Sequence, residues 1–75
     1  MITAKKTYLA TAVGDVGTMT YGGPTNGLAE YERFANEVGV LEGMEDQRVI
    51  EITFRHRESQ TGYRFVDIVR FKRLK

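Results

Sequence analysis

Few residues in this chain of 75 are suited to acid–base chemistry. His56 is the only histidine, the side chain that most readily exchanges a proton near neutral pH. It lies between Arg55 and Arg57, whose charges disfavour the protonated imidazole, and no serine or cysteine nucleophile motif flanks it. We therefore predict no catalytic residue and no enzyme. An active site shared by two protomers around His56 is the alternative.

Two other segments have the residue types, but not the spacing or motif, of an ion-binding site. Glu42, Glu45 and Asp46 lie close together, but their spacing lacks the alternating ligands of a calcium loop. The glycine-rich segment 22–27 lacks the lysine and the hydroxyl residue that follow the last glycine of a phosphate loop. The chain has no cysteine, so it lacks the usual ligands of structural zinc and forms no disulfide. The sequence thus predicts no metal and no cofactor.

Basic and aromatic side chains gather in the C-terminal third and form the predicted partner-binding site. These residues are Arg55, Arg57, Tyr63, Phe65, Phe71 and Arg73. Arginine and aromatic residues are enriched among the side chains that dominate the binding energy of protein interfaces. The same types bind nucleic acids, with arginines on phosphates and rings stacked on bases. We expect another protein or protein complex as the partner, with nucleic acid as the alternative.

The elements that position this set follow from composition and periodicity. Residues 2–13 are rich in Thr, Val, Ile and Tyr and predict a strand, with a short return strand at 18–21. Apolar residues at helical spacing, from Leu28 to Val38, predict a helix that follows Thr25 or Asn26 and runs to about Val38. Two further strands are predicted at 47–57 and 63–74, joined in a hairpin.

The predicted fold is a single α+β domain, residues 1–75. Its element order is ββαββ, a four-stranded and mostly antiparallel sheet with one helix packed on one face. Thr25 or Asn26 is predicted to cap the start of the helix, and Gly39 to end it. In the hairpin, Phe54 is expected opposite Ile68.

The two faces of the hairpin are expected to differ, because side chains alternate along a strand. The predicted core side carries Ile50, Ile52, Phe54, Val66 and Ile68. The other side carries Val49, Tyr63, Phe65, Val69 and Phe71, mixed with Arg55, Arg57, Arg73 and Asp67. A helix of about 13 residues covers only one face of such a sheet. We therefore expect the second set to be open and to contact a partner.

Charge and size narrow the class of function. The net charge is +1, but residues 30–46 carry −5 and residues 47–75 carry +5. This asymmetry indicates either that the chain binds a charged partner or that the two segments neutralise each other within one fold. A chain this short gives marginal stability, which self-association would raise, so we expect a homodimer. No apolar run approaches the roughly 20 residues of a membrane span, so we expect a cytoplasmic protein. The predicted function is stoichiometric binding or inhibition of another macromolecule, as by a phage or mobile-element protein that blocks host defence.

Overall fold

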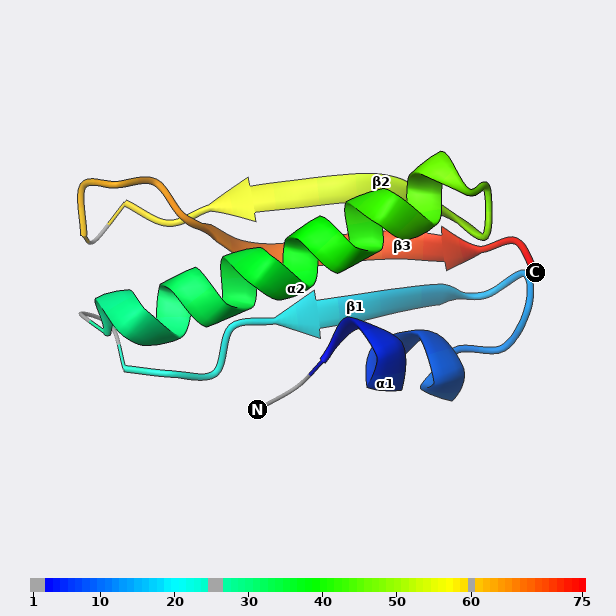
Figure 1. The fold of residues 1–75 in the computed structure, drawn as a ribbon, viewed down its shortest axis with the longest axis horizontal. Helices are drawn as coiled ribbons and strands as arrows, with labels where there is room; N and C mark the ends of the chain where they lie inside the picture. Colours follow the sequence, from blue (N-terminus) through cyan, green and yellow to red (C-terminus); the bar gives the residue numbers. More distant parts are fainter. Residues whose placement is uncertain (1–2, 25–26, 60) are drawn as a thin grey trace.

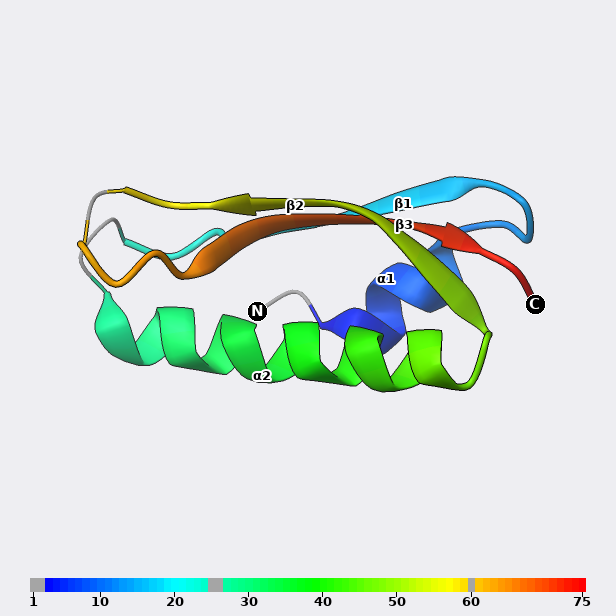
Figure 2. The same cartoon turned by 90° about the horizontal axis from the view of Figure 1, so that it is seen from above.

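The computed structural model describes residues 3–24, 27–59 and 61–75. Its elements are α1 (Ala4–Ala10), β1 (Val16–Thr20), α2 (Leu28–Asp46), β2 (Ile50–Arg57) and β3 (Val66–Arg73). The strands form one antiparallel sheet in the order β1-β3-β2 (Figure 1). Both helices lie against one face of this sheet, and no described element covers the other face (Figure 2). The predicted α+β class is confirmed, but the predicted ββαββ order with four strands and one helix is wrong.

The N-terminal segment forms helix α1 where a strand was predicted. Thr3 caps the helix by accepting a hydrogen bond from the backbone N–H of Lys6 at 3.2 Å. The hydroxyls of Thr7 and Thr11 donate to the carbonyl oxygens four residues earlier, each at 2.8 Å. Ala4, Thr7 and Thr11 are buried, which gives α1 one inward side at helical spacing. The threonines that suggested a strand are therefore accommodated in a helix, with their hydroxyls bonded to its backbone.

Residues from the other end of the chain hold α1 in place. The guanidinium of Arg73 donates to the carbonyl oxygens of Thr11 at 2.8 Å and Tyr8 at 3.3 Å. It also lies 4.1 Å from the centroid of the Tyr8 ring, a cation–π contact. The Tyr8 hydroxyl in turn donates to the carbonyl oxygen of Lys75 at 2.6 Å. Because a helix of 7 residues is not stable alone, these distant contacts are needed to keep α1 folded.

Helix α2 runs to Asp46, past the end predicted at Gly39. A Cβ at Gly39 would meet no atom within 4 Å, so this glycine lies on the open side of the helix. The buried stripe continues beyond it through Val38 and Leu41, and Met44 packs against the core. Burial of these side chains outweighs the cost of a helical glycine, about 0.5–1 kcal/mol relative to alanine.

The start of α2 is fixed from β1. The predicted caps, Thr25 and Asn26, lie outside the described residues, and Gly27 precedes the first turn without a side-chain cap. The Tyr21 hydroxyl donates to the carbonyl oxygen of Pro24 at 2.7 Å, and the N–H of Gly27 donates to the same oxygen at 3.1 Å. The link between β1 and α2 is therefore stabilised by a tyrosine.

The hairpin register differs from the predicted one. Phe54 lies opposite Arg70 instead of Ile68. The register shifts between Ile52 and Phe54, so that Thr53 is an extra residue on β2. A second shift between His56 and Arg57 leaves an extra residue on β3. Each shift reverses the faces that simple alternation assigns.

These shifts overturn the predicted assignment of faces. Val69 and Phe71, predicted to be open, are 0% exposed and belong to the core beneath the helices. Phe54, predicted to be in the core, is 41% exposed, and the Arg70 guanidinium lies 5.2 Å from its ring centroid. The core consists of Ala4, Met19, Phe34, Val38, Leu41, Ile50, Val69 and Phe71. The uncovered face carries Val16, Thr18, Thr20, Glu51, Phe54, His56, Ile68, Arg70 and Lys72.

Candidate functional site

A groove of about 260 Å³ lies between α2 and the end of the β2–β3 hairpin. We call it the hairpin groove. It is lined by Ala35, Val38 and Glu42 of α2 and by Arg55, Arg57, Tyr63, Arg64, Phe65 and Val66 of the hairpin. Four of the six predicted partner-binding residues, Arg55, Arg57, Tyr63 and Phe65, thus line one groove. Arg64 joins them, and sequence analysis did not select it.

A buried carboxylate orders the loop that carries Tyr63 and Arg64. Glu58 is only 4% exposed and accepts hydrogen bonds from the backbone N–H groups of Thr61 at 2.9 Å and Phe65 at 3.2 Å. The Thr61 hydroxyl also bonds to this carboxylate. The N–H of Glu58 donates to the carbonyl oxygen of Phe65 at 2.8 Å, closing the loop. A loop ordered in this way loses less entropy on binding than a free one.

Arg64 has a backbone conformation that is uncommon for a residue with a side chain. Its φ is 55°, in the left-handed region, where a non-glycine residue is disfavoured. Arg57 supports this conformation by donating from Nη1 to the Arg64 carbonyl oxygen at 3.1 Å. The Arg64 side chain is exposed and has no hydrogen-bond or ion-pair partner among the described residues. Residues held in such conformations cluster at functional sites.

A stack of four aromatic rings ends at the groove. Tyr21 and Tyr31 stack with centroids 3.8 Å apart, and Tyr31 stacks on Phe65 at 5.3 Å with an interplanar angle of 7°. Tyr63 follows at 5.8 Å from Phe65, tilted by 36°. Tyr63 is 68% exposed, so the last ring of the stack presents a large surface to solvent. Such a ring provides contact area at small entropic cost.

The phenols inside the stack are kept neutral. Burial raises the pKa of Tyr31 above its ordinary value, and the nearby carboxylate of Glu58 raises it further. Burial also raises the pKa of Tyr21, with a smaller contribution from Tyr31. Neither hydroxyl therefore ionises near neutral pH, and both act as uncharged ring surfaces.

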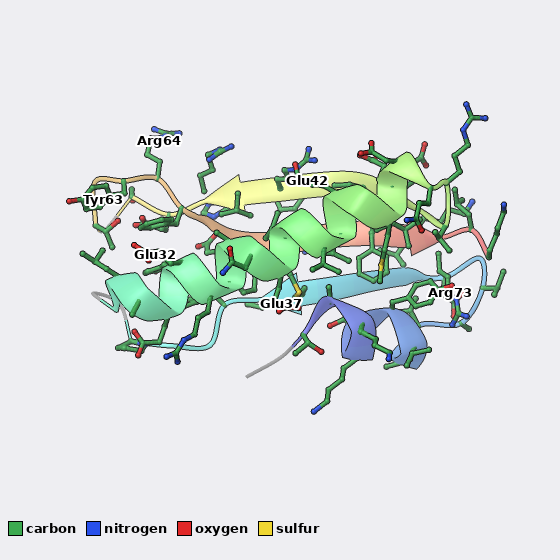
Figure 3. The ribbon with its side chains drawn as sticks, in the orientation of Figure 1. Glu32, Glu37, Glu42, Tyr63, Arg64 and Arg73 are labelled. Carbon is green, nitrogen blue, oxygen red and sulfur yellow. The ribbon has the colours of Figure 1, made fainter. Side chains whose placement is uncertain are left out.

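The two walls of the hairpin groove carry opposite charges. On the hairpin side are the guanidinium groups of Arg55, Arg57 and Arg64. On the α2 side Glu42 forms an ion pair with Arg55 at 3.4 Å, with both side chains about half exposed. Glu32 of α2 lies at the same end of the molecule as Tyr63 and Arg64 (Figure 3). The groove is therefore suited to a ligand that carries both signs of charge.

Phe71 and Arg73, the other two predicted partner-binding residues, lie elsewhere. Phe71 is 0% exposed in the core, so its predicted place on an open face is wrong. Arg73 lies at the opposite end of the molecule from Tyr63 (Figure 3), where its guanidinium is bonded to carbonyl oxygens of α1. The physical reason is the extra residue Thr53 on β2, because of which Ile52 lies opposite Phe71, so that Phe71 faces the core beneath the helices.

His56 has a partner that its neighbours in sequence did not indicate. Its Nδ1 lies 2.7 Å from Oδ1 of Asp67, on the uncovered face of the sheet. Among the described residues no hydroxyl group is hydrogen-bonded to His56. Within the described residues, this pair therefore has no serine or threonine hydroxyl bonded to it that it could activate as a nucleophile.

In residues 3–24, 27–59 and 61–75, no group of three or more His, Cys, Asp or Glu side chains is arranged to hold a metal ion. Within the same ranges, no helix combines the length and the apolar character needed to cross a membrane.

Comparison with known proteins found no matching family model, no matching curated protein and no matching solved structure.

Proposed function

We propose that this chain is a non-enzymatic binding protein that holds or inhibits another protein through the hairpin groove, in a stoichiometric complex. The observation that carries the proposal is the ordered loop that presents Tyr63 and Arg64. An exposed ring and a free guanidinium are held by buried Glu58 and by Arg57 before any partner arrives. Preorganised tyrosine and arginine side chains are typical anchors of protein interfaces.

The charges of the groove favour a protein over a nucleic acid. A nucleic acid presents phosphates of one sign along its whole length. The arginines of the hairpin would attract it, but Glu42 lines the other wall, and α2 as a whole carries five acidic residues in excess of its basic ones. A protein segment with both acidic and basic side chains complements both walls at once.

Nucleic acid is the second candidate, and one observation favours it. Phe54, Arg70 and Lys72 are exposed together on the uncovered face, away from the carboxylates of α2. Rings and basic residues on a sheet can stack on bases and contact phosphates. Such binding would weaken by orders of magnitude between about 50 and 200 mM salt.

Matched variants separate these candidates. Tyr63→Ala combined with Arg64→Ala removes the two presented side chains, and Lys72→Ala removes a charge from the uncovered face. Both changes are at exposed positions, so unfolding free energies should stay within about 0.5 kcal/mol of the parent protein. We expect the double variant to lose capture of a partner from a lysate of the producing cells, while Lys72→Ala retains it.

The molar mass of the captured complex is then measured by light scattering, and the complex is treated with nuclease. A fixed ratio of the two chains that survives nuclease supports the proposal. Capture that depends on Lys72 or is lost on nuclease treatment would instead support the nucleic-acid candidate. A photoreactive phenylalanine analogue at position 63, with Val40 as the exposed control position, identifies the chain that touches the groove. A cytoplasmic setting and a phage or mobile-element source remain part of this proposal.

A further inference from the structure

The outer edge of β1 carries backbone groups that no described residue pairs with. At one end of the strand the N–H of Arg73 donates to Asp15 at 3.0 Å, and at the other the N–H of Tyr21 donates to Asp67 at 2.7 Å. Alternate residues of an antiparallel strand point their backbone groups to the same side. Asp15 and Tyr21 point theirs toward β3, so three of the residues between them point their N–H and C=O groups away from β3. The three are Val16, Thr18 and Thr20.

A second groove, which we call the edge groove, runs beside this strand. It has a volume of about 360 Å³ and is lined by Lys6, Thr7, Ala10, Thr11 and Thr18. Lys6, Thr7 and Ala10 of α1 supply one wall of the groove, and this helix lies beside the outer side of β1 (Figure 1). The helix approaches this closely because Gly17 has no side chain, since a Cβ there would lie 2.3 Å from Oγ1 of Thr11.

Features that normally block an edge strand are missing from β1. Its sequence, VGTMT, contains no charged residue and no proline, and it pairs with β3 without a register shift. Charges, prolines and bulges are the usual protection of an edge, and β1 has none of them; its length of only 5 residues and the neighbouring helix α1 are the protective features that it does have. Exposed apolar side chains lie nearby, with Leu9 62% and Val13 61% exposed.

The charges beside β1 indicate which kind of strand could bind at its outer edge. Lys5 and Lys6 of α1 are exposed, and Lys6 lines the edge groove. In residues 3–24 Asp15 is the only acidic residue, and from outside this segment the carboxylate of Glu37 accepts a hydrogen bond from the N–H of Ala4 at 2.9 Å. A second copy of the chain would add two lysines at this place, whereas a strand with carboxylates would complement them.

We propose that β1 and the edge groove bind an extended acidic segment of another protein, which adds a fourth strand to the sheet. The backbone of the segment pairs with the outer groups of Val16, Thr18 and Thr20. One of its alternate side chains, of small apolar type, enters the groove beside Ala10, and a carboxylate lies near Lys6. Main-chain bonds supply the affinity and the groove supplies the selectivity in this mode of recognition.

The test is a nitrogen-15 NMR titration with two synthetic peptides. The acidic probe is acetyl-Asp-Val-Thr-Val-Asp-amide, and the matched probe has lysine in place of both aspartates. We expect saturable shifts of the amides of Val16, Thr18 and Thr20 and of α1. We expect the acidic probe to bind about two- to fivefold more tightly, the preference of an exposed ion pair.

Two variants probe the two parts of the proposal. Lys6→Glu places a glutamate three residues after the Thr3 cap, the pattern of a capping box, so α1 remains folded. It should reverse the preference between the peptides. Thr18→Pro removes an outward N–H at an edge position where proline is tolerated, and it should abolish the shifts, whereas Thr18→Val should retain them.

Several results would overturn the proposal. One such result is that the amide signals of β1 do not shift at millimolar concentrations of either peptide. Another is that the parent protein binds both peptides equally tightly. A third is protection of the Thr18 amide that grows with protein concentration alone, which would show that the edge pairs with a second copy. Tyr63→Ala with Arg64→Ala should leave the titration unchanged, so this inference and the proposed function can fail separately.

Discussion

The two outer strands of the sheet, β1 and β2, meet solvent in different ways. On β2 the carboxylate of Glu45 accepts a hydrogen bond from the N–H of Ile52 at 2.9 Å. The register shift at Thr53 then bends the strand, and Arg55 and Arg57 follow it as charged edge residues. On β1 none of these devices is present among the described residues.

The comparison separates two ways of binding a partner. The β2 side blocks backbone pairing and presents side chains at the hairpin groove. The β1 side presents few side-chain anchors, but the outward backbone groups of Val16, Thr18 and Thr20 have no partner among the described residues. One small sheet can therefore offer one edge for recognition by side chains and the other for recognition by strand addition.

The largest expected effect comes from breaking the contact of α1 with β1. Gly17→Val would place atoms 2.3 Å from Oγ1 of Thr11 and 2.9 Å from the ring of Phe71. We expect a loss of about 1–3 kcal/mol or more of unfolding free energy, measured by urea denaturation. The control is Gly39→Ala, which meets no atom within 4 Å and should raise stability by about 0.5–1 kcal/mol. Equal behaviour of the two variants would contradict the close packing at Gly17.

A smaller effect is expected from removing the protection of β2. Glu45→Ala leaves the N–H of Ile52 without its acceptor, at a cost of about 1 kcal/mol. Amide hydrogen exchange at Ile52 should accelerate, and Glu45→Gln, which keeps an acceptor, should retain most of the protection. Asp46→Ala, at the neighbouring exposed position, should change stability by less than about 0.5 kcal/mol. Unchanged exchange at Ile52 would refute the protective role of Glu45.

The arginines of the β2 edge should contribute least to stability. Arg55→Ala removes the ion pair with Glu42, which is about half exposed, and we expect a change of about 0.2–1 kcal/mol. A double-mutant cycle with Glu42→Ala measures the coupling, which should fall further in high salt. A coupling well above 1 kcal/mol would mean that Arg55 stabilises the fold and is less available to a partner.

The ring stack should influence the pH dependence of stability only in alkali, and not at neutral pH. The pKa of Tyr31 is raised in the folded state by burial and by Glu58, so the neutral phenol favours folding. This contribution is fully present below the unfolded pKa of about 10 and is lost as the pH rises through the folded value. Tyr31→Phe should therefore weaken the fall of stability above pH 10. An identical pH profile for the variant would remove this account.

Sequence reasoning identified the α+β class and the positions of most elements in the C-terminal two thirds. Those elements are long or strongly patterned, as in the stripe of Tyr31, Phe34 and Val38 in α2. It failed at α1, because seven residues rich in threonine carry a strand preference. The contacts that make this segment helical come from Arg73 and Lys75, which no local pattern reveals.

The candidate site was predicted in part for a similar reason. Arg55, Arg57, Tyr63 and Phe65 were selected by residue type and do line one groove. Phe71 was misplaced because a single extra residue, Thr53, reverses the alternation, and a bulge has no strong signal in composition. Arg64 was missed because its importance depends on a left-handed backbone conformation that only the structure shows.

The dependence of α1 on Arg73 affects the order in which the chain folds during synthesis. Residues 4–11 leave the ribosome long before residue 73 is added, yet their helix needs that guanidinium on its final carbonyl groups. The first helix to be synthesised should therefore be among the last to fold. Nascent chains stalled before residue 66 should be cut by protease within residues 4–11, and protection should arise only once β3 has been released.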